Sequence, residues 1–289
     1  MVPSSARASS HKSSAKPSSA AVVESNAVLQ SLSTERPRIN VLGVGIDAID
    51  MSTAVRRITS AVAAGEVGYV CVTGVHGVME AHKDPPLRRI LNSSLLTTPD
   101  GMPMVWLGRA AGFRRMSRVY GPELMLQLCR ESAVTGASHF LYGGNDGVAE
   151  SLANSLRKRF PGLRIVGTYT PPFRPLSADE ERRLAQRLEA LRPDYMWVGL
   201  STPKQERFMA EYSGRLPVTV MLGVGAAFDM NSGRTKQAPR WMQHSGLEWL
   251  FRLLQEPRRL FKRYAKNNPA FVFRVAQQKL RLRQYSLDV

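Results

Sequence analysis

The sequence has few cysteines and no long apolar run, and both absences exclude classes of protein. Cys71 and Cys129 are the only cysteines among 289 residues, too few and too far apart for a disulfide framework or a zinc knuckle. A reducing compartment is therefore expected. No uninterrupted apolar run is long enough to cross a bilayer, and the N-terminus lacks the apolar core of a secretory signal. We expect a protein that does not span a membrane.

Metal-binding patterns are missing as well. The five histidines have no zinc-ligand spacing, and no Asp-x-Asp pair is present to hold a divalent cation against a diphosphate. We therefore expect no metal and no cofactor. The charge of any phosphate leaving group would then be neutralised by backbone amides and by Arg or Lys side chains.

Acidic residues are scarce relative to basic ones. The chain has 23 Asp and Glu against 40 Lys and Arg, a formal net charge of +17. Residues 233–289 contain 13 basic and 3 acidic side chains, so a net charge of +10 lies in the last fifth of the chain. Such an excess points to an anionic partner: nucleic acid, nucleotide phosphates or acidic lipid.

Composition divides the chain into three parts. Residues 1–38 are rich in Ser and Ala with few large apolar side chains, which predicts a disordered tail, or alternatively a cleaved transit peptide. Residues 39–232 have the pattern of an α/β core. Residues 233–289 are helical in pattern, aromatic and strongly basic, which is typical of an amphipathic appendage that lies on a membrane surface.

Apolar strands alternate with amphipathic helices throughout the core. The expected strands lie at 40–46, 68–75, 94–100, 138–144, 163–169, 194–200 and 218–228. Continuous apolar strands of this kind favour an α/β fold with a mostly parallel, Rossmann-like sheet and helices on both faces. Ligands of such sheets bind beyond the carboxyl ends of the strands, so the residues that follow each strand are the candidates for function.

Three strand-end motifs have both a structural and a functional interpretation. In "TTPDG", Asp100 either shapes a turn or is a reactive carboxylate at the end of a strand. In "YGGNDG", residues 142–147, Tyr142, Gly143 and Gly144 either cradle a pyrophosphate or form a plain turn before a helix. "GVGIDA", residues 43–48, matches a dinucleotide pattern, but Asp47 would place a carboxylate beside the pyrophosphate.

The other polar residues at strand ends have ordinary structural interpretations too. Thr73 either contacts a ligand or ends a strand, and His76 is either a ligand contact or a structural histidine. Gln205 and Glu206 follow "STPK" at the start of a helix. They either contact a ligand or cap that helix. Asp229 is a candidate for substrate binding or for a helix N-cap.

An ordered set of motifs resembles a known family. "TTPDGMPMVW", "RVYGPELM", "FLYGG", "RPDYMWVGLSTPKQE", "LGVGAAFDMNSGR" and "GLEWLFRLLQEPRR" occur in this order between Asn40 and Tyr264. In these motifs the sequence is similar to the WecG/TagA/CpsF family of bacterial glycosyltransferases. Each motif is weak alone, but the ordered set is specific.

The resemblance implies transfer of a hexosyl-type sugar from a UDP-sugar to a polyprenyl-diphosphate-linked saccharide. It also implies inversion at the anomeric carbon without a metal ion, at the inner face of the cytoplasmic membrane. It places the general base at Asp100 and polar contacts at Thr73 and Gln205. The residues implied to reach donor or lipid phosphates are Arg252, Arg259 and Lys262, the last standing where an arginine is more usual.

One position departs from the family pattern. Many members have an Asn two residues after the threonine, whereas this chain has Val75. Either His76 takes over part of that role or the donor sugar differs. This loop resembles that of an exopolysaccharide-type branch.

Two other functions remain open from the sequence. The net charge of +17 and the basic, aromatic C-terminus would also suit a nucleic-acid-binding protein, although no recognised nucleic-acid motif is present. A catalytically inactive subunit that binds a sugar nucleotide is the second alternative. We expect an enzyme whose partners include an anionic membrane surface but no nucleic acid. Whether the chain forms a homo-oligomer stays open.

Overall fold

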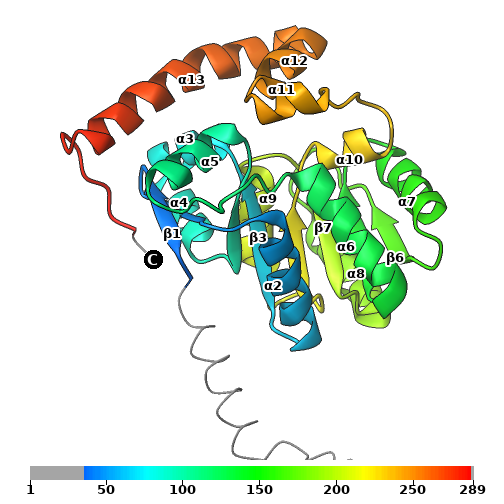
Figure 1. Ribbon diagram of the computed structural model, residues 1–289. Coiled ribbons are helices and arrows are strands. Elements are labelled where there is room, and N and C mark those ends of the chain that lie inside the picture. Colours follow the sequence, from blue (N-terminus) through cyan, green and yellow to red (C-terminus); the bar gives the residue numbers. More distant parts are fainter. Residues whose placement is uncertain (1–35, 288–289) are drawn as a thin grey trace, which may run out of the picture. The chain divides into compact units, whose positions relative to one another are not determined.

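A six-stranded parallel sheet lies at the centre of the fold (Figure 1). In the order β4-β3-β8-β7-β5-β6, every neighbouring pair is parallel. The strands are β3 (Gly68–Thr73), β4 (Leu96–Pro99), β5 (Ser138–Gly143), β6 (Arg164–Tyr169), β7 (Tyr195–Gly199) and β8 (Val220–Gly223). This arrangement confirms the predicted fold class.

The computed structural model describes residues 36–287. The predicted tail of residues 1–38 therefore lies almost entirely outside the described residues. The first strand, β1 (Arg38–Val41), begins one residue before the predicted start of the core.

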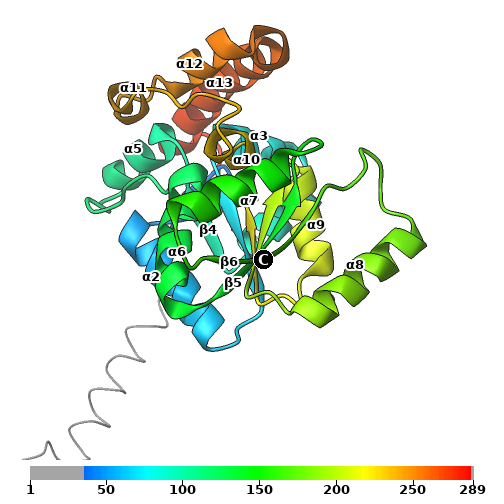
Figure 2. The ribbon, with the colours of Figure 1, turned by 90° about the vertical axis from the view of Figure 1, so that its right-hand side faces the viewer.

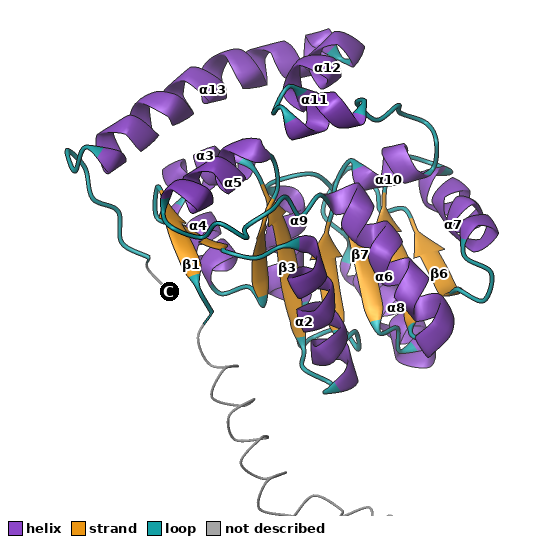
Figure 3. Cartoon of the chain, in the orientation of Figure 1, coloured by secondary structure: helices purple, strands orange, loops and turns teal. Residues whose placement is uncertain are grey.

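Helices cover both faces of the sheet (Figure 3). Val70 of β3 packs on one face, whereas its neighbours Tyr69 and Cys71 pack on the other, as expected for alternating strand residues. The first face is covered by α2 (Met51–Ala63), α6 (Gly121–Thr135) and α7 (Val148–Arg159). The second is covered by α3 (Val75–Lys83), α4 (Pro85–Asn92), α8 (Ala178–Leu191) and α9 (Lys204–Tyr212). Ser177 and Glu180 have the spacing of a capping box in the sequence, and they form one at the start of α8.

Residues 40–46, predicted to be one strand of the sheet, instead form most of a separate antiparallel hairpin of β1 and β2 (Val44–Asp47). Its two turn residues, Leu42 and Gly43, have φ values of 55° and 90°, as in the primed turns of tight hairpins. The prediction was wrong because Leu42 is apolar and fully buried, so the turn does not interrupt the apolar run. The "GVGIDA" motif lies in this hairpin, and no helix follows before Met51.

Two short helices replace segments that were predicted differently. α5 (Met102–Ala110) lies between the expected strands at 94–100 and 138–144, in a stretch for which no strand was expected. α10 (Ala227–Asn231) lies where a strand was expected to continue to Phe228. β8 ends at Gly223 because the small residues that follow turn the chain, with Gly225 at a φ of 48°. Asp229 is consequently inside the first turn of α10, and Ala226 is the N-cap.

The C-terminal helices are α11 (Arg240–His244), α12 (Glu248–Gln255) and α13 (Pro257–Lys279). They lie over the carboxyl ends of the strands (Figures 1 and 2). α13 buries Leu260, Asn267 and Phe271. Within residues 36–287, no helix is both long enough and apolar enough to cross a bilayer.

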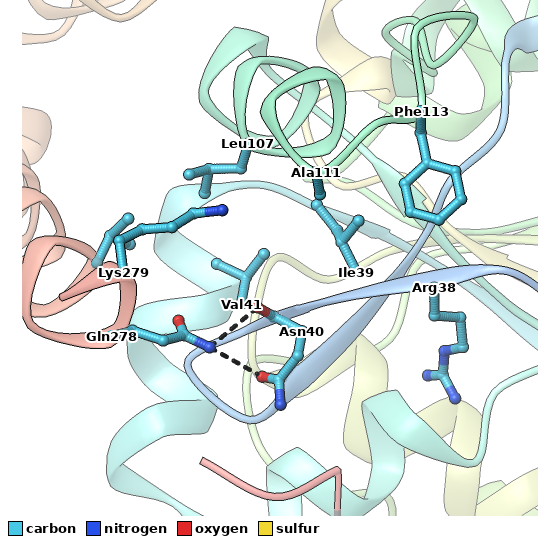
Figure 4. A pocket seen from close by; sticks show the side chains of 10 residues that line it. Arg38, Ile39, Asn40, Val41, Leu107, Ala111, Phe113, Gln278 and Lys279 are labelled. Atoms are coloured by element: carbon cyan, nitrogen blue, oxygen red, sulfur yellow. Dashed lines mark hydrogen bonds between the residues drawn. The ribbon is translucent and has the colours of Figure 1, made fainter. Parts of the chain in front are cut away.

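The far end of α13 is fixed to the β1–β2 hairpin. Gln278 accepts a hydrogen bond from the Leu42 amide at 3.0 Å. The side-chain amide of Gln278 donates to the carbonyl of Asn40 at 3.0 Å (Figure 4). A cavity of about 220 Å³ lies between this hairpin, α5 and α13. The C-terminal helices are therefore tied to the hairpin, and α13 also contacts α3.

Candidate active site

The ends of β3 and β4 place Thr73 and Asp100 side by side. The amide of Asp100 donates to the carbonyl oxygen of Thr73 at 3.0 Å. A Cβ atom at Gly74 would lie only 2.9 Å from the Asp100 carbonyl oxygen and 3.9 Å from its Oδ2. A glycine at position 74 thus lets the two loops approach this closely. Together they form one wall of the candidate site.

Asp100 directs its carboxyl group toward Arg118. Asp100 Oδ1 lies 3.5 Å from Arg118 Nε and makes no hydrogen bond among the described residues, although 32% of the side chain is exposed. Burial raises the pKa of the Asp100 carboxyl above its ordinary value; Arg118 opposes this shift, Glu248 adds to it, and Arg252 opposes it.

Arg118 connects the Asp100 loop to the C-terminal helices. It donates to the Glu248 carboxylate on α12 and to Gln243 Oε1 on α11, the latter at 3.3 Å. Its Cζ lies 3.8 Å from the centroid of the Tyr120 ring. Arg118 belongs to a motif of the family resemblance, but it was not among the predicted site residues. The available signal was a single cation inside "RVYGPELM".

Gln205 lies in the first turn of α9, next to the end of β8. Its side chain is buried, and its Nε2 donates to Glu206 Oε1 at 3.1 Å. The same oxygen accepts from Thr202 Oγ1 at 2.8 Å, so Glu206 points into the protein. Burial raises the pKa of Glu206. Gln205 Oε1 faces the loop at Gly225 and accepts no hydrogen bond from the described residues.

The "YGGNDG" motif divides between the loop edge and the core. Gly143 packs so closely on the end of the neighbouring strand β7 that a Cβ atom would lie 2.7 Å from the backbone of Gly199. Gly144 follows it and donates its amide to the Gly199 carbonyl at 3.1 Å. Tyr142 is buried and stacks on Phe208 with ring centroids 4.4 Å apart. The structure thus places Tyr142 in the core and the two glycines at the strand ends.

His76 connects α3 to α13. Its Nδ1 lies 3.2 Å from Asn267 Nδ2 of α13 and 3.8 Å from Glu80 Oε1. Burial lowers the pKa of His76 to about 4; Arg263 contributes to this shift, while Glu80 and a backbone hydrogen bond at Thr202 oppose it. The imidazole is therefore neutral at pH 7. His76 has contacts that hold α13 in place, and its predicted contact with substrate stays a prediction.

Arginines of the C-terminal helices act on the pKa values of two carboxyl groups near the strand ends, Asp100 and Asp229. Burial raises the pKa of Asp229, and Arg259 and Arg252 oppose that shift. Arg252 also acts on the pKa of Asp100. Burial, Arg259 and Arg252 together lower the pKa of Arg263. We call Arg252, Arg259 and Arg263 the arginine cluster, since they act on one another or on the same neighbouring carboxyl groups; Arg259 is also paired with Glu256, with 2.6 Å between Nε and Oε2. Guanidinium groups in such a cluster suit a polyanion.

Lys262 differs from its neighbour Arg263 in burial. It is exposed, whereas the next residue, Arg263, is partly buried and acts on the pKa of His76. Successive side chains on an α-helix point about 100° apart, which follows from 3.6 residues per turn. The predicted phosphate contact of Lys262 stays a prediction, and Arg263 is a further cation that the sequence did not single out.

Comparison with known proteins identifies the family. The sequence profile described as "Glycosyl transferase WecG/TagA/CpsF family" matches residues 39–285. The chain belongs to this family. It is a glycosyltransferase, and the family's match extends over both the sheet and the C-terminal helices.

Two bacterial relatives of this glycosyltransferase are both named N-acetylglucosaminyldiphosphoundecaprenol N-acetyl-beta-D-mannosaminyltransferase. The protein of Bacillus subtilis (strain 168) is 31% identical over 177 residues, 61% of this chain and 67% of the relative. The protein of Staphylococcus aureus (strain MW2) is 24% identical over 249 residues, 86% of this chain and 95% of the relative.

Metal-ligating side chains do not gather in the described part of this glycosyltransferase. Among residues 36–287, no group of three or more His, Cys, Asp or Glu side chains is placed to hold an ion. The charged groups at the strand ends are instead the arginines above Asp100 and Asp229.

Proposed function

We propose that this glycosyltransferase moves a hexosyl-type sugar from a UDP-sugar to a polyprenyl-diphosphate-linked saccharide, with inversion and without a metal ion. The names of the two relatives support the acceptor class, since both specify a saccharide carried on diphosphoundecaprenol. They also make an N-acetylated hexosamine the first donor to test. Whether the product is an exopolysaccharide or another surface glycan depends on that donor and acceptor.

The position of Asp100 carries the proposal. An inverting transfer needs a base next to the attacking hydroxyl, on the face of the sugar opposite the departing UDP. Asp100 takes the hydroxyl proton as the new glycosidic bond forms, and the old C1–O bond breaks with its electron pair leaving on UDP. The raised pKa of Asp100 suits this role, because a more basic carboxylate accepts the proton more readily. Arg118 keeps the ionised form accessible.

The arginine cluster receives the leaving group. In this proposal, Arg252, Arg259 and Arg263 neutralise the diphosphate, which strengthens charge-assisted hydrogen bonds as negative charge develops on UDP. Thr73 and Gln205 hold the donor from the floor of the site. Gln205 supports this assignment because its Oε1 faces the Gly225 loop and accepts no hydrogen bond from residues 36–287.

In this proposal the outer side of the C-terminal helices docks on the membrane. Trp241 is 65% exposed and Leu280 is 70% exposed, and Lys262 and Lys266, which lie between them in the sequence, are exposed too. Such a surface suits the interface of an anionic leaflet, where each Lys or Arg contributes about 1 kcal/mol of attraction. Co-sedimentation with anionic liposomes and with duplex DNA across a salt series distinguishes this role from nucleic-acid binding.

The decisive assay measures UDP release with a panel of UDP-sugars and a short-chain polyprenyl-diphosphate saccharide as acceptor. We expect acceptor-dependent release with one or a few donors. UDP binding without transfer to any acceptor would instead identify an inactive sugar-nucleotide-binding subunit.

A further inference from the structure

The outer surface of the C-terminal helices contains an apolar groove of about 790 Å³. Trp249 and Leu253 of α12 line one end, and α13 supplies the rest. Small residues at 265, 269 and 276 share one face of α13 because their spacing is four and seven residues. The bulkier Phe261 and Val272 also line the groove. The volume of this groove is within the range of small-molecule binding sites.

We propose that this groove binds the isoprenoid chain of the acceptor lipid. The proposal rests on the acceptor class proposed above and adds a binding site for the part of the substrate that does not react. The occupant is thus a methyl-branched hydrocarbon chain that carries a diphosphate at one end.

The groove is continuous with the arginine cluster. Arg252 lies between Trp249 and Leu253 in the sequence of α12, and the two apolar residues line the groove. Tyr264 also lines it and contacts the Trp249 ring edge-on, with centroids 5.8 Å apart. Arg252 and Arg263 both act on the pKa of the Tyr264 phenol. Tyr264 therefore marks the boundary between the cationic and the apolar surfaces.

This arrangement matches the chemistry of the ligand. In a polyprenyl diphosphate the phosphate is joined directly to the first isoprene unit, so a diphosphate held by arginines carries its chain onto the nearest surface. That surface is the groove. Its lining is almost entirely apolar, with Asn268 as a polar exception. Burying a hydrocarbon chain there removes apolar area from water on both partners.

A hollow differs from the protruding side chains that suffice for membrane docking. Apolar side chains that protrude gain contacts simply by entering the bilayer, whereas an unfilled groove loses dispersion contacts along its walls. A flexible chain restores those contacts. Groove binding and membrane docking therefore respond differently when the groove is filled by mutation.

The test fills the groove without removing apolar surface. Ala265 and Ala276 are exposed on α13, so Ala265→Phe and Ala276→Phe should leave the fold intact. Leu254→Phe is the matched control, because Leu254 is 74% exposed and is not among the residues that line the groove. The KM is measured for two acceptors with the same saccharide diphosphate, one on a long isoprenoid chain and one on a short alkyl chain.

We expect each filling variant to raise the KM for the long-chain acceptor about tenfold, roughly the effect of losing the burial of two CH₂ groups. The KM for the short-chain acceptor and the liposome affinity should not change, and the control variant should match the wild type. An unchanged KM for the long-chain acceptor would overturn the proposal. So would a loss of liposome affinity in place of a chain-length effect, which would assign the groove to the acyl chains of the bilayer.

A binding assay separates this proposal from the proposed reaction. An isoprenyl diphosphate without sugar is titrated against the full chain, with the fluorescence of Trp249 as the signal and Trp249→Phe as the reference. If the wild type transfers no sugar but binds this probe, and Ala276→Phe does not, the groove stands and the reaction fails. Equal binding by both overturns the groove. A dimer that dissociates in Ala276→Phe, without a change in probe binding, would assign the groove to a second copy of the chain.

Discussion

Arg118 Nε lies 3.5 Å from Asp100 Oδ1, and the two side chains come from segments on either side of α5. The pairing holds a partly buried carboxylate at the end of β4, where burial and Glu248 raise its pKa and Arg118 lowers it. Asp100 is thus an interacting group at the strand ends rather than a turn residue alone.

Replacement of Asp100 tests its role as the base. Asp100→Asn keeps the size of the side chain but cannot accept the proton, so turnover should fall on the order of 10²–10⁴-fold. The thermal unfolding midpoint and the affinity for UDP should stay close to those of the wild type. Turnover near the wild-type rate would refute the assignment.

Arg118 should control the pH dependence of the reaction. Because Arg118 lowers the pKa of Asp100, Arg118→Gln should raise that pKa further. A carboxylate with a higher pKa is protonated at a higher pH, so activity should begin to fall at a higher pH as the solution is acidified. The measurement is kcat/KM against pH for both proteins. An acidic limb that stays in place would show that Arg118 does not act through Asp100.

Arg263 and Lys262 form a matched pair with the same formal charge on different sides of α13, one partly buried and the other exposed. Arg263→Gln should raise the KM for the diphosphate substrates about tenfold, since it removes a charge-assisted contact. Lys262→Gln should leave that KM unchanged and weaken binding to anionic liposomes about fivefold, the equivalent of about 1 kcal/mol. The reverse pattern would return the substrate role to Lys262.

His76 should make the stability of the protein depend on pH. Its pKa is about 4 in the folded chain, below the ordinary value of 6.5, so the unfolded chain binds the proton more readily. The free energy of unfolding should therefore fall as the pH decreases from about 6.5 to about 4, by up to about 3 kcal/mol, and level off below. The titrating groups around His76 are Glu80, Arg263 and Lys83.

The difference between the wild type and His76→Gln isolates this effect, because His82 and His139 also have lowered pKa values and remain in both proteins. Chemical denaturation at a series of pH values provides the measurement. Parallel pH profiles for the two proteins would contradict the predicted linkage.

Removal of divalent cations should leave the reaction intact. In the proposed mechanism the arginine cluster neutralises the diphosphate, so turnover in excess EDTA should equal turnover in added Mg²⁺. A loss of activity that Mg²⁺ or Mn²⁺ restores would show that the arginines are not sufficient.

Much of the fold follows from local patterns that survive packing. The apolar strands at residues 68–73 and 195–199 were recognisable because both of their faces are buried, and the α8 capping box because its two residues act within one turn. The hairpin turn at Leu42 and Gly43 was not recognisable. The turn requires a positive φ at Leu42, and an apolar, buried leucine is not a residue that predicts such a turn.

The amino-acid sequence by itself determined the alternation of strands and helices, the strand-end position of Asp100 and the basic, aromatic character of the tail. These are properties of residue order and composition, which act over a few neighbouring positions. Only the tertiary structure decided that Arg118 meets Asp100, that Arg263 rather than Lys262 faces His76, and that α12 and α13 enclose an apolar groove. These relationships join segments far apart in the chain, or depend on which side of a helix is buried, and both are fixed only when the helices pack.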